Sequence, residues 1–72
     1  MNTFKQAAIK VLEKVKKPLH YNEITRLSLE SGFLETEGAT PEATMNSQIV
    51  IDIKKKKGAS DFIKIAPGTF AL

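Results

Sequence analysis

The residues best suited to chemistry in this sequence are cationic. Four consecutive lysines, Lys54–Lys57, are followed by Lys64. Ammonium groups gathered in this way bind phosphates, and each neutralised phosphate releases counterions. The same run is also typical of a solvated helix end, where lysines complement the helix dipole and Asp52 can pair with Lys55 or Lys56. The sequence leaves both interpretations open.

A catalytic or metal centre lacks the residues it needs. The chain has a single histidine, His20, and no cysteine, which removes disulfides, thiolate zinc sites and cysteine nucleophiles. A lone histidine has no partners for a catalytic triad or a ligand set, and no pair of glutamates has a spacing that suggests acid–base work. We therefore expect no enzyme activity, metal or cofactor. We expect His20 to pack or hydrogen-bond at the start of a helix.

Charge is segregated along the chain, although the net charge is only +3. Residues 1–20 sum to +4, residues 21–50 to −4 and residues 51–72 to +3. An anion-binding surface should therefore come from the two ends of the chain, whereas the acidic middle suits a basic protein partner.

The first predicted helix carries clear start and stop signals. Thr3 is its cap, Gln6 completes a capping box, and Pro18 cannot continue the helix. Its apolar residues recur at helical spacing and form one stripe, made of Phe4, Ala8, Val11, Leu12 and Val15.

A short extended piece, 19–21, leads to a second helix with Asn22 as its expected cap and Gly32 as its stop. Residues 33–39 are then expected to form a loop that carries Glu35 and Glu37. This loop is longer than the turn of a tight helix-turn-helix.

The third predicted helix begins at Thr40–Pro41, a hydroxyl cap followed by proline at the first helical position, and runs to about Lys56, where Gly58 ends it. Its buried seam is Met45, Ile49 and Ile53, with Val50 at the edge. Projected at about 100° per residue, its outward face carries Thr44, Ser47, Gln48, Ile51, Lys54 and Lys55.

The last segment has the period of strands. Phe62–Ile65 and Thr69–Leu72 are predicted to pair as a hairpin, with Pro67–Gly68 at the centre of a type II turn. Phe70 and Leu72 share one face of the second strand. Three helices closed by a two-stranded β-wing give a mainly α fold, a winged helix-turn-helix, with residues 1–72 as one domain.

The chain resembles the HARE-HTH domain, a winged helix of homeobox proteins, Asx-like chromatin proteins and restriction endonucleases. It is also similar to the N-terminal domain of the delta subunit of bacterial RNA polymerase. The resemblance covers nearly the whole chain and depends on the joint order of several segments: 8–12, 18–24, 38–44, Asp52–Ile53, 62 and 67–72. It implies a winged-helix fold and a DNA-binding or DNA-associated module, often fused to enzymes that act on DNA or chromatin. The delta-subunit relatives also imply docking on RNA polymerase.

The leading prediction is a non-catalytic DNA-binding module linked to transcription regulation or to a DNA-acting enzyme. Lysines at the end of the third helix and on the wing contact phosphates, and polar residues of that helix lie nearest the bases: Lys54, Lys55, Lys56, Lys57 and Lys64, with Thr44, Ser47 and Gln48. Sequence specificity should be weak, because no arginine or asparagine for bidentate base readout stands on that face. Glu42 at the start of the helix would repel phosphates, so the C-terminal half is the expected contact.

The alternative prediction is a protein-interaction adaptor that docks on RNA polymerase or chromatin machinery. Ile51, which is apolar on an otherwise polar face, and the acidic loop with Glu35 and Glu37 would make that contact. The sequence predicts no membrane span and no small-molecule substrate, since no apolar stretch approaches the roughly 20 residues that cross a bilayer. The simplest location is intracellular, either cytoplasmic or nucleoid-associated if the source is prokaryotic.

Overall fold

A computed structural model describes residues 2–36 and 38–72 of the chain. The elements follow in the order α1 (Phe4–Val15), β1 (Leu19–His20), α2 (Tyr21–Glu30), α3 (Pro41–Lys56), a 3-10 turn η1 (Lys57–Ala59), β2 (Ile63–Ala66) and β3 (Thr69–Ala71). The mainly α, winged-helix arrangement is confirmed.

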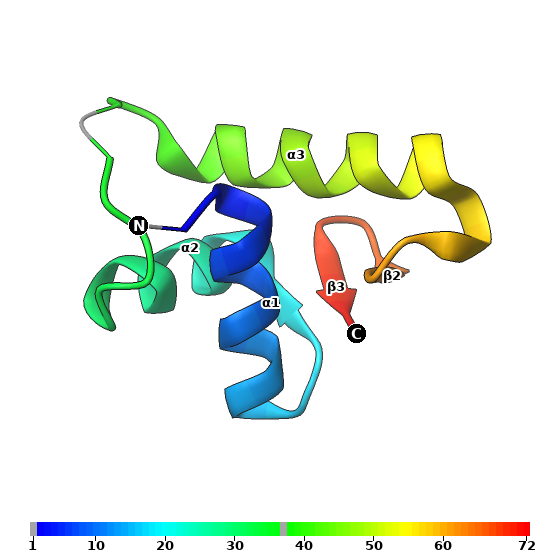
Figure 1. The fold of residues 1–72 in the computed structure, drawn as a ribbon, viewed down its shortest axis with the longest axis horizontal. Coiled ribbons are helices and arrows are strands. Elements are labelled where there is room, and N and C mark those ends of the chain that lie inside the picture. Colours follow the sequence, from blue (N-terminus) through cyan, green and yellow to red (C-terminus); the bar gives the residue numbers. More distant parts are fainter. Residues whose placement is uncertain (1, 37) are drawn as a thin grey trace.

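Helix α3 runs along the longest dimension of the molecule, which measures 31 × 23 × 21 Å (Figure 1). Helices α1 and α2 and the small sheet all lie on one side of α3, so the opposite side of this helix is left open to solvent (Figure 1). The sheet lies beneath the C-terminal half of α3, next to the segment that follows this helix (Figure 1).

The wing has three strands, which corrects the predicted two-stranded hairpin. The antiparallel strand order is β1-β3-β2, with Leu19 opposite Phe70 and His20 opposite Thr69. Strand β1 is part of the extended piece expected between the first two helices. Two residues are too few to show an alternating pattern, so only the fold reveals their pairing with β3.

The apolar stripe of α1 forms the centre of the core. Ala8, Val11 and Leu12 are buried as predicted, and Phe70 of β3 closes the core from the sheet side. Met45 and Ile49 of α3 are fully buried, as expected for the seam of this helix. The remaining buried apolar residues are Ala7, Ile24, Leu34 and Phe62. Leu72 does not share the burial of Phe70, because β3 ends at Ala71 and Leu72 is exposed.

The helix ends differ from the prediction in two places. Helix α2 is capped by His20 and not by Asn22: the backbone N–H of Asn22 donates to His20 Nδ1 at 3.2 Å. Helix α3 turns at Lys57, whose φ is 49°, one residue before the predicted stop at Gly58. A side-chain acceptor on His20 performs the role expected of Asn22, and the η1 turn absorbs Gly58.

The loop between α2 and α3 is anchored at its start. The backbone N–H of Leu34 donates to the carbonyl of Ser28, and Asn2 Nδ2 donates to the carbonyl of Phe33 at 2.9 Å. Glu35 is exposed, and Glu37 lies outside the described residues.

Candidate nucleic-acid interface

The open side of α3 carries the residues predicted for its outward face. Thr44, Ser47, Gln48, Ile51, Lys54 and Lys55 are all exposed. They follow one another at intervals of three and four residues, which places them in one stripe on a helix surface. The opposite side of the helix is held by Met45 and Ile49 in the core. The stripe is therefore hydroxyl and amide in its first half and cationic at its end, with one isoleucine between.

The four-lysine run does not act as a unit. A helix turns by about 100° per residue, so Lys54 and Lys55 emerge on the outer stripe while Lys56 emerges on the side of α1. Lys56 Nζ lies 3.2 Å from Asp52 Oδ1. Lys54, Lys55 and Lys57 form no ion pair with any residue that the structure describes. Only part of the run is free for phosphates.

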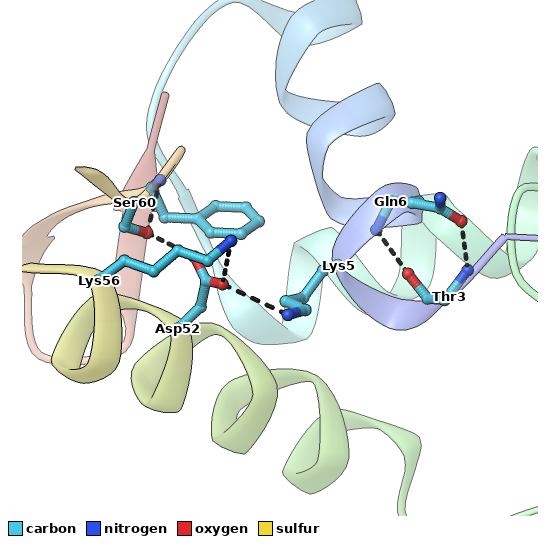
Figure 2. A network of polar contacts seen from close by, with 7 residues as sticks. Thr3, Lys5, Gln6, Asp52, Lys56 and Ser60 are labelled. Carbon is cyan, nitrogen blue, oxygen red and sulfur yellow. Dashed lines mark hydrogen bonds and ion pairs between the residues drawn. The ribbon is translucent and has the colours of Figure 1, made fainter.

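Asp52 is the centre of a polar cluster that joins α1, α3 and the segment before β2 (Figure 2). Its side chain is 3% exposed. Ser60 Oγ donates to Asp52 Oδ2 at 2.6 Å, and Lys5 Nζ donates to Asp52 Oδ1 at 3.3 Å. The backbone N–H of Phe62 in turn donates to Ser60 Oγ at 3.1 Å. The hydrogen bond from Ser60 holds the pKa of Asp52 below its usual range, against the effect of burial, and Lys56 and Lys5 add to the lowering.

The capping box predicted for α1 stands beside this cluster (Figure 2). The N–H of Gln6 donates to Thr3 Oγ1 at 3.1 Å, and the N–H of Thr3 donates to Gln6 Oε1 at 2.9 Å. Because the first turn of α1 is fixed in this way, Lys5 is presented to Asp52 from a defined helix end.

Lys64 contributes from the wing. It lies opposite Phe70 in the β2–β3 ladder, and directly opposed residues point to the same face of a sheet. The Lys64 side chain therefore leaves the sheet on the face that carries the buried Phe70, which is the face turned toward the helices. It is exposed and belongs to an element separate from the outer stripe of α3.

The tip of the hairpin is held against the protein body. Gly68 has a φ of 76°, as the second central position of a type II turn requires. The N–H of Tyr21 donates to the carbonyl of Gly68 at 2.9 Å, and a Cβ built on Gly68 would lie 2.9 Å from His20 Nε2. The His20 and Tyr21 rings are 4.3 Å apart. His20 therefore packs and hydrogen-bonds at the start of α2, as expected.

Sequence reasoning missed the roles of Lys5 and Ser60. Asp52 had been expected to reach Lys55 or Lys56, and the structure selects Lys56, four residues on. Lys5 lies 47 residues from Asp52 along the chain, so no local spacing rule identifies this partner. The one local signal for Ser60 was a serine shortly before a strand, where hydroxyls commonly bond backbone N–H groups.

Neither a metal centre nor a membrane span is found in the part of the chain that the structure describes. Among these residues, no group of three or more histidine, cysteine, aspartate or glutamate side chains is placed to hold a metal ion. Within the same residues, no helix has both the length and the apolar character needed to span a membrane.

Comparison with protein-family models matches residues 2–72 to the HARE-HTH model, described as a helix-turn-helix domain of homeobox, ASXL and restriction endonuclease proteins. Comparisons with curated proteins and with solved structures give no match.

Proposed function

Because the chain belongs to the HARE-HTH family, a family of helix-turn-helix DNA-binding domains, we propose that it binds duplex DNA through the outer stripe of α3 and the end of that helix. Lys54, Lys55, Lys57 and Lys64 contact phosphates, and Thr44, Ser47 and Gln48 lie nearest the base edges. Lys56 has a smaller share, because Asp52 already neutralises it.

The observation that carries this proposal is the open side of α3. A helix of 16 residues stands clear of the rest of the protein along one side, and its exposed residues are donors and cations that suit a polyanion. An α-helix is about 10–12 Å wide with its side chains, and the major groove of B-DNA is about 12 Å wide. The acidic start of α3, at Glu42, leaves the C-terminal half as the part that approaches phosphates.

The test is a salt titration of affinity for a 20-base-pair duplex. Each phosphate contact contributes about 0.9 to the slope of log affinity against log salt. The double variant Lys54→Gln/Lys55→Gln should flatten the slope by about 1.8, and Lys56→Gln should change it far less. A matched control is Lys14→Gln/Lys17→Gln, which removes the same charge from exposed positions on and just after α1. Equal slopes for the two double variants would refute the proposed contact surface.

A second candidate function is docking on a protein, such as RNA polymerase or chromatin machinery. The exposed isoleucines Ile63 and Ile65 of the edge strand β2, each 54% exposed, favour it, together with Ile51 and the acidic residue Glu35. In this case DNA affinity at physiological salt would be low, and binding to the protein partner would be lost on Ile51→Asp. Either function places the domain in transcription regulation or beside an enzyme that acts on DNA.

A further inference from the structure

We propose that Ile51 contacts the 5-methyl group of thymine in the major groove and gives the domain a preference for A·T base pairs. The inference rests on the proposed DNA-binding function and adds the chemical group that is recognised. It starts from an apolar side chain that remains outside the core: Ile51 is 51% exposed.

The neighbours of Ile51 distinguish a base contact from a protein-docking patch. On a helix surface the nearest residues are those three and four positions away. For Ile51 they are Ser47, Gln48, Lys54 and Lys55, all exposed and all polar or cationic. The other large apolar side chains with high exposure lie elsewhere in the described structure, namely Leu29 on α2, Ile63 and Ile65 on β2, and Leu72 after β3. A single isoleucine ringed by hydroxyl, amide and ammonium groups is not part of a contiguous apolar surface.

The major groove matches this arrangement. It presents the thymine methyl group as its apolar feature, adenine N6 and N7 as a donor and an acceptor for an amide, and phosphates along both rims. Gln48 lies three residues before Ile51, and Lys54 and Lys55 lie three and four residues after it. A helix seated with Ile51 on a methyl group therefore has an amide on one side for adenine and two cations on the other for the backbone.

Removal of the methyl group alone tests the contact. The probes are a 20-base-pair duplex of alternating A·T pairs and the same duplex with deoxyuridine in place of thymine. The wild-type domain should bind the thymine duplex about fourfold more tightly for each methyl group in contact, since one buried carbon has roughly that effect. Ile51→Ala should bind both duplexes equally and keep the wild-type salt slope.

The double comparison separates the contact from changes in DNA shape. A shape effect of deoxyuridine would persist in Ile51→Ala, whereas a methyl contact would vanish. Ile63→Ala is the matched control, because it truncates an isoleucine of similar exposure on β2 and should keep the thymine preference.

The outcomes also separate this inference from the proposed function. Equal affinity of the wild-type domain for both duplexes, with salt-dependent binding intact, would overturn the methyl contact alone and leave Ile51 to a protein partner. A preference that survives Ile51→Ala would overturn it as well. No binding to either duplex at low salt would overturn the proposed function and this inference together.

Discussion

Replacement of Asp52 by asparagine should lower the free energy of unfolding by about 2–3 kcal/mol. The asparagine oxygen can still accept from Ser60, but the amide that replaces the second oxygen is a donor facing the ammonium groups of Lys5 and Lys56. A hydrogen bond to a charged group contributes about 1.5–3 kcal/mol. The Lys5 and Lys56 side chains are 40% and 51% exposed, so their ion pairs add no more than about 1 kcal/mol each.

This loss is a large fraction of the total stability. At about 0.05–0.15 kcal/mol per residue, a chain of 72 residues has roughly 4–11 kcal/mol. A loss of 2–3 kcal/mol corresponds to a decrease in Tm of about 10–20 °C in a domain of this size. Urea unfolding followed by far-ultraviolet circular dichroism is the appropriate assay, because the chain has no tryptophan.

The matched control is Asp61→Asn, which makes the same change in net charge at an exposed position of the segment before β2. It should change the free energy of unfolding by less than about 0.5 kcal/mol. If Asp52→Asn were no more destabilising than Asp61→Asn, the Asp52 cluster would be a surface feature and not a stabilising junction.

The pH dependence of the same pair of proteins checks the sign. The pKa of Asp52 in the folded protein lies below that of the unfolded chain, chiefly because Ser60 donates to the carboxylate. The stabilisation is therefore complete above the unfolded pKa, about 3.9, and is lost as the pH falls through the folded pKa. The difference between wild type and Asp52→Asn should be constant from about pH 5 to 8 and shrink below about pH 4.

Three smaller perturbations follow from the backbone and the core. Gly68→Ala should destabilise the fold by about 2–3 kcal/mol, since it combines a positive φ with a Cβ only 2.9 Å from His20 Nε2; a neutral effect in urea unfolding would contradict the close approach. Lys57→Gly should stabilise by about 1 kcal/mol, because Lys57 has φ 49° and ψ −123°, a region that glycine adopts readily; a lower Tm would refute this. Ser28→Ala should raise Tm, because Ser28 Oγ is buried without a hydrogen-bond partner among the described residues; a lower Tm would mean that the hydroxyl has a partner.

The sequence predicted the elements that local rules determine. The capping box of Thr3 and Gln6 and the barrier at Pro18 fix α1, and the hydroxyl–proline start fixes α3. The period of 3.6 residues then separates the buried Met45 and Ile49 from the exposed stripe of α3. In each case the signal lies within a few residues of the feature it determines.

Features that depend on distant residues could not be predicted in this way. Strand β1 exists because Leu19 lies opposite Phe70, and Lys5 reaches Asp52 because α1 packs beside α3. The cap of α2 failed for a related reason. Asn22 has a stronger general preference for a cap than His20, but the pairing of β1 with β3 keeps His20 extended, which is the conformation a cap needs.

The lysine run illustrates how a local count and a folded surface diverge. Counted from the sequence, Lys54–Lys57 with Lys64 offers five cations, which would contribute about 4.5 to the salt slope of DNA binding. The helical turn directs Lys56 to Asp52, a carboxylate that is buried, ionised and already bonded to Ser60. The remaining four cations would contribute about 3.6. The same carboxylate that stabilises the end of α3 therefore limits the charge available to DNA, and stability and phosphate binding compete for Lys56.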